Sequence, residues 1–392
     1  MDAKKDQIIS ETDEPPGSGG HNEEWNDWKW QLRNSITDLE KLRGIFKFTS
    51  EKLEKLKKII LKYPFGITPY YLSLIDVNNP QDPIGLQCLP NAEEGNLYFD
   101  VQEDPLGEEH DTMLPGLVHR YPDRVLLMLT DMCPVYCRHC TRKREWQKGK
   151  WIRSKSELQE IYRYISEHRE VRDVIISGGD PFILSTGIID SILKAIRQIP
   201  HVEIIRIGTR CPVVLPQRID DQLLAVLKKY RPIWLNTHFN NPAEITHESS
   251  SACERLVSLG IPVNNQTVLL KGINDDIQTM TKLCQALLKI NVRPYYLFQC
   301  DPVSGTGHLR TSIEKGLEII KGMRGFTSGL AVPTFVVDGL QGQGKVPLQP
   351  ADYVVALEKD CAVLRGYKGE VFKYYNPEGS KNEDRHNVQF KR

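Results

Sequence analysis

From about residue 124 onward, short apolar segments alternate with amphipathic segments of helical period. The apolar segments have the length and composition of buried strands, and the segments between them repeat apolar residues every three to four positions. The expected strands cover residues 124–130, 173–179, 203–210, 233–239, 263–270, 293–299 and 334–338, and the expected helices cover residues 155–168, 188–199, 217–230, 247–260, 277–290 and 311–325. This alternation predicts an α/β fold, in which crossover helices cover a parallel sheet curved into a partial or full barrel.

The chain before and after this repeat has a different character. Residues 1–24 are polar and interrupted by proline and glycine, which predicts a disordered lead-in. Helical periodicity follows, and Thr49 or Ser50 is placed to cap the second helix. We therefore expect an N-terminal helical extension over residues 25–119, a barrel core over 120–350, and a C-terminal extension over 351–392 that ends in a loose tail.

Composition narrows the class of protein. The 392 residues include 51 basic and 51 acidic side chains, and this neutral balance argues against a protein that mainly binds nucleic acid or an anionic membrane surface. No apolar run approaches the roughly 20 residues of a membrane span, and the N-terminus lacks the apolar stretch of a secretory signal. Nine irregularly spaced cysteines are typical of free thiols and ligands in a reducing compartment, so we expect a cytoplasmic protein.

Polar residues follow the expected strands, at the edge where barrels of this kind gather their chemistry. The segments concerned are residues 133–140, 177–180, 208–212, 236–242, 264–267 and 299–301, together with Asp338. We expect them to converge on one rim.

Cys133, Cys137 and Cys140 form a C-x3-C-x2-C cluster after the first expected strand. A closed zinc or iron–sulfur site needs a fourth ligand, but the next cysteine, Cys211, lies two strands later. The spacing favours a 4Fe–4S cluster with one open iron over a chance group of buried cysteines. With Tyr136 before the middle cysteine, the motif resembles the signature of radical S-adenosylmethionine (SAM) enzymes, whose open iron binds SAM.

Lys345 closes a G-x-x-x-x-G-K pattern after the last expected strand. A nucleotide phosphate loop is disfavoured, because Val346 replaces the magnesium-binding hydroxyl and Pro347 prevents the following helix. A lysine in a permissive glycine loop can instead bind pyridoxal phosphate covalently. The alternative is a solvated loop lysine.

Together these motifs resemble the lysine 2,3-aminomutase family. The resemblance runs through "HRYPDRVLLMLTDMCPVYCRHCTRKR", "ISGGDP", "VNNQTVLLKGIND", "RPYYLFQCD" and "VPTFVVDGLQGQGKVP", and it covers roughly residues 50–350. It implies an isomerase that uses a 4Fe–4S cluster, SAM and pyridoxal phosphate. Such an enzyme moves the α-amino group of L-lysine to the β-carbon and produces β-lysine (3,6-diaminohexanoate).

The resemblance also implies roles for individual residues. Cys133, Cys137 and Cys140 would bind the cluster, and Lys345 would hold pyridoxal phosphate, with Arg120 and Arg124 on its phosphate. The implied SAM residues are Ser177, Gly178, Gly179, Asp180, His139 and Gln266, and the implied substrate residues are Arg142 for the carboxylate and Asp301 and Asp338 for the distal ammonium. Plainer alternatives remain: surface arginines, a histidine that packs the cysteine loop, and aspartates that cap helices.

The sequence also departs from the family pattern. The loop is less rich in glycine because it contains Leu340, Gln341 and Gln343, and Phe298 replaces a usual tyrosine. The C-terminal zinc cysteines are missing and Asp276 stands at the partner cysteine's position, so we expect no zinc site. A homo-oligomer stays possible.

Three rival functions remain open. The paired aspartates would also suit arginine, whereas glutamate is disfavoured. The second rival is a radical SAM enzyme without pyridoxal phosphate. The third is a nucleic-acid binder that uses the basic residues 142–155. For the favoured function we expect a flavodoxin- or ferredoxin-type electron donor.

Overall fold

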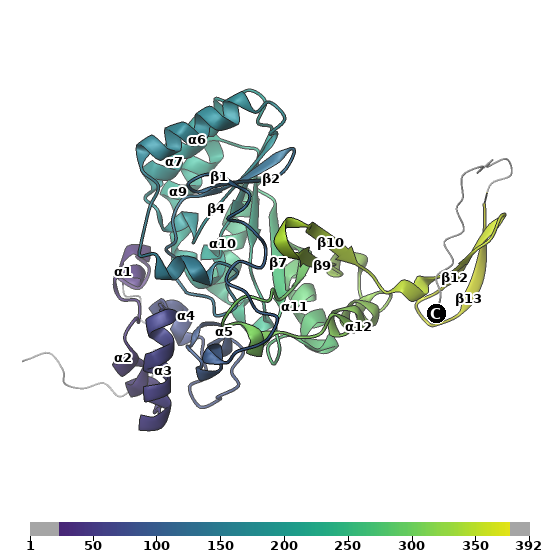
Figure 1. Ribbon diagram of the computed structural model, residues 1–392, viewed down its shortest axis with the longest axis horizontal. Coiled ribbons are helices and arrows are strands. Elements are labelled where there is room, and N and C mark those ends of the chain that lie inside the picture. Colours follow the sequence, from purple (N-terminus) through teal and green to yellow (C-terminus); the bar gives the residue numbers. More distant parts are fainter. Residues whose placement is uncertain (1–22, 377–392) are drawn as a thin grey trace, which may run out of the picture.

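The body of the protein is built on one ten-stranded sheet (Figure 1). The computed structural model describes residues 23–376. The strands are β1 (Thr112–Leu114), β2 (Leu117–Tyr121), β3 (Arg124–Met128), β4 (Asp173–Ser177), β5 (Ile204–Gly208), β6 (Ile233–Thr237), β7 (Val263–Leu269), β8 (Val292–Gln299), β9 (Thr334–Gly339) and β10 (Gly344–Leu348), in that spatial order. Strands β3 to β9 are parallel, while β1, β2 and β10 add antiparallel edges. Within residues 23–376 the edge strands β1 and β10 do not pair with each other, so the barrel is partial.

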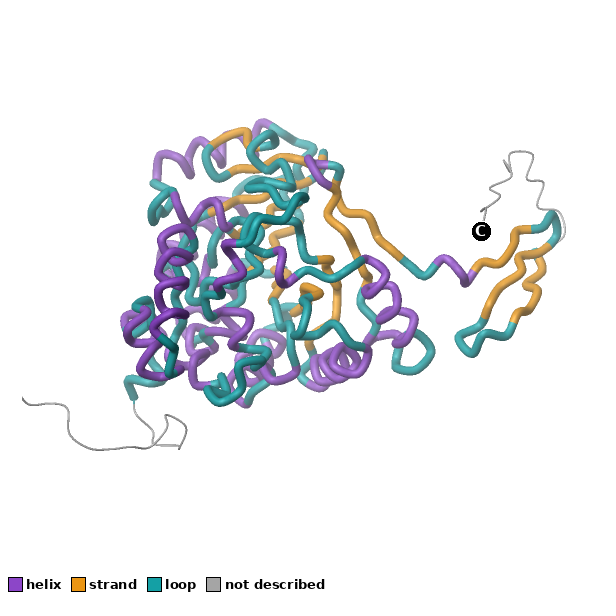
Figure 2. Tube along the Cα trace, turned by 60° about the horizontal axis from the view of Figure 1, so that its bottom comes forward, coloured by secondary structure: helices purple, strands orange, loops and turns teal. Residues whose placement is uncertain are grey.

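Helices cover the outside of the parallel strands, as Figure 2 shows. They are α6 (Lys155–Glu167), α7 (Thr186–Arg197), α8 (Cys211–Val214), α9 (Asp221–Lys229), α10 (His247–Ser258), α11 (Ile277–Lys289) and α12 (Ile313–Met323). Each of the longer ones begins at a side chain that caps its free N–H groups, such as Ser154 before α6 and Asp276 before α11. Their apolar faces are buried against the sheet; in α7 these residues are Ile189, Ile192, Leu193 and Ile196. The predicted alternation of strands and helices is confirmed.

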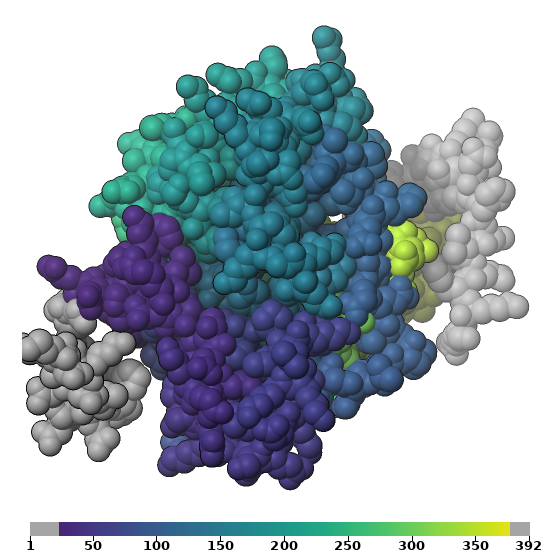
Figure 3. All heavy atoms as spheres, turned by 60° about the vertical axis from the view of Figure 1, so that its left-hand side comes forward, coloured from purple at the N-terminus to yellow at the C-terminus, as the bar shows by residue number. Residues whose placement is uncertain are grey.

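The N-terminal helices are part of the same core. They are α1 (Trp28–Arg33), α2 (Leu39–Phe46), α3 (Ser50–Lys62), α4 (Pro69–Ser73) and α5 (Gly85–Cys88). Thr49 caps α3, as one of the two predicted residues. Leu42 and Leu56 are fully buried and belong to the same hydrophobic cluster as the apolar faces of the strands and their covering helices, and Figure 3 shows this segment packed directly on the body. The expected boundary between residues 119 and 120 falls inside β2, which pairs with β3.

A separate three-stranded sheet follows the barrel and stands away from it in Figure 1. It consists of β11 (Val354–Leu357), β12 (Cys361–Arg365) and β13 (Val371–Tyr375), all antiparallel. The sequence did not predict these strands, and residues 374–375 belong to β13 instead of a loose tail. The expected lead-in over residues 1–22 and the tail from residue 377 lie outside the described part. Between residues 23 and 376, no helix combines the length and apolarity needed to cross a membrane.

Candidate active site

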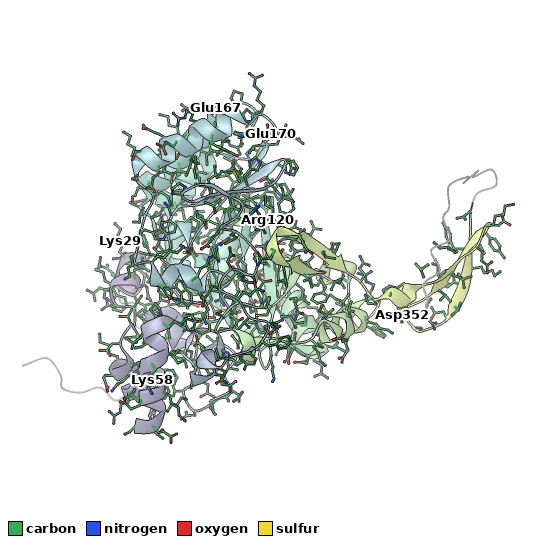
Figure 4. The ribbon with its side chains drawn as sticks, viewed as in Figure 1. Lys29, Lys58, Arg120, Glu167, Glu170 and Asp352 are labelled. Atoms are coloured by element: carbon green, nitrogen blue, oxygen red, sulfur yellow. The ribbon has the colours of Figure 1, made fainter. Side chains whose placement is uncertain are left out.

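A cavity of about 560 Å³ is lined by one face of the parallel strands and by the loops that follow them, with residues from the start of β3 and β4 as well as from the strand ends. It brings together residues from the first antiparallel strand pair to the last hairpin. The predicted site residues that line it are Arg120, Arg124, His139, Arg142, Ser177, Gln266, Asp301, Asp338 and Lys345. Figure 4 labels Arg120 beside the hairpin of β9 and β10, and Gly342 of that hairpin lies against the Arg120 guanidinium. Of the segments expected to meet at one rim, those that contain His139, Ser177, Gln266, Asp301 and Asp338 do contribute to one cavity. Arg124 was not among them and is the first residue of β3.

Lys345 lies in a strand, not in a glycine loop as the sequence suggested. It is the second residue of β10 and pairs in register with Asp338 of β9. Its Nζ lies 2.6 Å from Asp338 Oδ1 and 4.6 Å from the centre of the Phe298 ring. Pro347 is tolerated in the same strand because β10 is an edge of the sheet. The register of the β9–β10 hairpin therefore directs the Lys345 side chain toward the cavity.

Asp301 is the second carboxyl group of this end of the cavity and follows β8. Burial, and then the neighbouring Asp338 carboxylate, raise the pKa of Asp301 to about 7. Lys345 opposes this rise but does not cancel it. Two carboxylates therefore share one ammonium here, and a second cation at this position would be stabilised.

Arg142 is held by a carboxylate that the sequence did not single out. Its Nε and Nη2 donate to Glu108 Oε2 at 2.9 Å and Oε1 at 2.6 Å. Arg144 Nη2 also donates to Glu108 Oε2, at 3.0 Å. Burial would raise the pKa of Glu108, but the two guanidinium groups lower it to about 2. Glu108 is thus a buried carboxylate that stays ionised.

Arg120 and Arg124 also line the cavity and already have protein partners. Arg120 Nε donates to Asp111 Oδ2 and its Nη2 donates to the carbonyl oxygen of Leu106, both at 2.6 Å. The Arg124 guanidinium stacks on the Tyr121 ring at 3.7 Å. These contacts fix two guanidinium groups at the cavity wall, which suits the binding of a phosphate group.

Sequence reasoning also missed Arg206 and His238, which line the cavity. Arg206 comes from β5 and pairs with Asp173 of β4 at 2.7 Å. Burial, followed by the charge of Arg210, lowers the pKa of His238 to about 4, so this imidazole is neutral at physiological pH. The signals that could have found them are an arginine inside an apolar strand and a histidine directly after one.

The three cysteines lie on the loop that follows β3. Burial, followed by the charges of Asp180, Cys140 and Cys137, raises the pKa of the Cys133 thiol well above its ordinary value. Arg210 Nη1 donates to Cys137 Sγ at 2.7 Å. No three His, Cys, Asp or Glu side chains among residues 23–376 are arranged to hold a single metal ion. A 4Fe–4S cluster makes a different demand, because each thiolate binds its own iron, and a compact loop with three thiols and a buried cation fits it.

The segment from Ser177 to Asp180 has two structural roles besides its expected one. Ser177 lines the cavity. Gly178 packs on the backbone of Leu129 and Thr130 after β3, and Gly179 packs on the start of the cysteine loop, where an added Cβ would lie 2.1 Å from the carbonyl oxygen of Met132. Asp180 accepts hydrogen bonds from Thr209 Oγ1 at 2.6 Å and from the backbone N–H of Arg210 at 2.7 Å. Close packing therefore requires glycine at position 179. Asp180 connects the end of β4 to the end of β5.

His139 and Gln266 line the cavity beside the cysteine loop. Burial, followed by the charge of Arg210, lowers the pKa of His139 well below its ordinary value. Its Nδ1 is buried and has no hydrogen-bond partner in the described part of the chain. An unpaired buried polar atom beside three cysteines fits a bound polar molecule such as SAM.

Comparisons with known proteins identify the family of this chain. A family model described as the radical SAM superfamily matches residues 127–284, and one described as lysine-2,3-aminomutase matches residues 320–391. The L-lysine 2,3-aminomutase of Acetoanaerobium sticklandii is 50% identical over 91% of this chain and 86% of its own. That of Bacillus subtilis is 50% identical over 91% of this chain and 75% of its own, and the glutamate 2,3-aminomutase of Clostridioides difficile is 46% identical over 90% and 83%. The chain belongs to the lysine 2,3-aminomutase family of radical SAM isomerases, and this membership implies a 4Fe–4S cluster, SAM and pyridoxal phosphate as its cofactors.

Proposed function

We propose that the protein is an L-lysine 2,3-aminomutase, which moves the α-amino group of L-lysine to the β-carbon and releases β-lysine. The carboxylate pair Asp301 and Asp338 is the observation that carries the choice of substrate. Asp301 is a half-buried acid with a raised pKa, and it gains a partner when a cationic side chain enters. Identity alone does not choose, since a relative named for glutamate is 46% identical.

Different residues of the cavity would bind the two charged ends of the substrate. Arg142 would bind the α-carboxylate, because guanidinium forks match carboxylates in geometry and charge. Asp301 and Asp338 would hold the distal ammonium of the same molecule. Held at both ends, the amino acid is fixed with its α- and β-carbons between the cysteine loop and Lys345, which is the orientation that a migration between these carbons needs.

Cofactor binding is assigned to the other residues of the cavity. Cys133, Cys137 and Cys140 would hold the cluster, His139 and Gln266 would contact SAM, and Lys345 would hold pyridoxal phosphate. Arg120 and Arg124 would bind the phosphate group of pyridoxal phosphate. When bound, the cluster and SAM supply a radical that removes hydrogen from the substrate, and pyridoxal phosphate carries the migrating nitrogen.

Two further assignments rest on the family and on the cysteines. A low-potential electron donor of the flavodoxin or ferredoxin type would reduce the cluster. All nine cysteines are free, which supports a reducing compartment such as the cytoplasm.

Product analysis tests the proposal. Anaerobically reconstituted protein is incubated separately with lysine, arginine, ornithine and glutamate, and the β-amino acids are identified by mass spectrometry. We expect β-lysine to form with the highest kcat/KM. Arginine 2,3-aminomutase activity is the second candidate, since the same carboxylates suit a guanidinium, and preferential formation of β-arginine would establish it instead.

A further inference from the structure

Glu108 and Arg142 form a two-point ion pair at the cavity wall. Glu108 is 6% exposed and accepts from three guanidinium nitrogens of two arginines. Both of its oxygens face Arg142, so the two planar groups are held edge to edge. A buried carboxylate with such partners stays charged and rigid.

The segment that carries Glu108 also contacts two other parts of the site. The carbonyl oxygen of Pro105 accepts from the backbone N–H of Gln341 at 2.8 Å, in the turn before Lys345. The carbonyl oxygen of Leu106 accepts from Arg120. Residues 104–108 therefore form a strap that lies across the site and fixes three of its parts relative to one another.

Glu108 occupies only one edge of the Arg142 guanidinium. The Nε and one N–H of Nη2 point to Glu108, and Nη1 has no hydrogen-bond partner within residues 23–376. The terminal edge, made by Nη1 and the second N–H of Nη2, is a complete fork for another carboxylate. Arg142 is at the cavity wall, so this edge is available to a molecule in the cavity.

We propose that Glu108 is a positioning residue that sets the selectivity of the site for a free α-carboxylate, by holding Arg142 with its terminal fork toward the cavity. This inference rests on the proposed function, because it deepens the role of Arg142. Arginine has a long flexible side chain, and fixing it beforehand lowers the entropic cost of binding. Without Glu108, Arg142 would keep its charge but lose its orientation.

Equilibrium binding to the holoenzyme tests this role. L-lysine and L-lysinamide, which lacks the carboxylate, are titrated separately, and the absorbance change of bound pyridoxal phosphate is followed without turnover. The variants are Glu108→Gln and, as the matched control, Glu109→Gln. The Glu109 side chain is 64% exposed, and its carboxylate lies 3.5 Å from Arg144 Nε and from Lys148 Nζ.

We expect the wild type and Glu109→Gln to prefer lysine over lysinamide. In Glu108→Gln the dissociation constant for lysine rises about 10- to 100-fold, and that for lysinamide is unchanged. The preference, which is the dissociation constant of lysinamide divided by that of lysine, therefore falls toward one. Glu108→Asp, which keeps the charge but has a shorter reach, gives an intermediate preference and serves if the glutamine variant does not fold.

Three outcomes would overturn the proposal: an unchanged preference, a parallel loss of affinity for both ligands, or tighter lysine binding. The second would make Glu108 merely structural, and the third would make it a competitor for Arg142. Failure of the proposed function looks different, since the wild type itself would then neither respond to lysine nor convert it.

Discussion

Lys345 is the residue on which the use of pyridoxal phosphate depends. Its Nζ faces the cavity, with Asp338 as its ion-pair partner. We expect Lys345→Ala to lose both turnover and the visible absorbance of bound pyridoxal phosphate, while the iron content is unchanged because the cysteines lie on another loop. Lys321→Ala is the control, since Lys321 pairs with Asp352 on the surface. Retention of the absorbance by the alanine variant would remove Lys345 from this role.

The ionised Asp301 carboxylate favours binding of a cationic substrate but lowers the stability of the fold. Its pKa of about 7 in the folded protein exceeds its ordinary value of 3.8. The folded state therefore holds this proton more tightly, and its stabilising effect is lost as the pH rises from about 4 to 7. Above pH 7 the buried carboxylate is charged and destabilises the fold.

Asp301→Asn should consequently be more stable than the wild type at pH 8, by about 2–4 kcal/mol, and no more stable at pH 4. Thermal unfolding is measured without pyridoxal phosphate, so that Lys345 keeps its charge. Asp338→Asn should bring no such gain, because it leaves Lys345 unpaired. An equal shift at both pH values would mean that packing, not charge, is responsible.

At this scale the sequence predicted the residues that follow strands and missed those fixed by distant contacts. Asp301 and Asp338 could be placed because strand ends meet at one rim, whereas Gln266 lies inside β7 and was given its role by the family resemblance. Glu108 lies in an irregular segment, and its partner Arg142 is 34 residues away in the sequence. No periodicity marks such a residue, since only the folded chain brings the two together.

At the scale of elements, the segment that follows β4 packs closely on the cysteine loop. This contact limits the size of the side chain that position 179 can have. Because a Cβ on Gly179 would lie 2.1 Å from the Met132 carbonyl oxygen, Gly179→Ala must displace the cysteine loop. We expect the variant to bind less than half the wild-type iron after reconstitution, with a lower melting temperature. Iron analysis and thermal unfolding measure both effects.

Gly187→Ala is the matched control for this experiment. Gly187 lies in the first turn of α7, and nothing stands within 4 Å of an added Cβ. It should keep full iron content and equal or slightly higher stability, since alanine favours a helix. Normal cluster assembly in Gly179→Ala would show that the cysteine loop does not depend on this packing.

Elements were predictable where burial imposes a period. The alternation of β3 to β9 with helices was visible because one side of every element is buried. The sheet of β11 to β13 was not, because β11 and β13 are exposed at every position and β12 is buried or half-buried at every position, so none of the three alternates. Lys345 was placed in a loop because its strand, β10, is a short edge next to glycines.

For the whole molecule, the question is how the N-terminal part is joined to the barrel. The short helix of residues Ala92–Gly95 carries Glu94, which is 2% exposed. Its carboxylate accepts from Arg138 Nε at 2.9 Å and from Lys143 Nζ at 2.8 Å, on either side of Cys140. Arg138 and Lys143 are both fully buried, so two cations of the cysteine loop depend on one carboxylate from another part of the chain.

Removing that carboxylate should weaken the whole fold. Glu94→Gln leaves two buried cations without a counter-charge, and we expect a loss of about 3–5 kcal/mol of unfolding free energy. Denaturant unfolding measures the loss, and iron content reports on the cysteine loop. Glu93→Gln is the control, because Glu93 is the exposed neighbour on the same turn.

The pattern of the two measurements locates the effect. If the N-terminal part and the barrel are one cooperative unit, as their shared core indicates, Glu94→Gln lowers the midpoint of a single transition and the slope stays the same. If they are separate domains, the variant instead shows two transitions, and only the first moves. A wild-type midpoint together with full iron content would show that Arg138 and Lys143 find other partners and that this junction does not hold the cysteine loop in place.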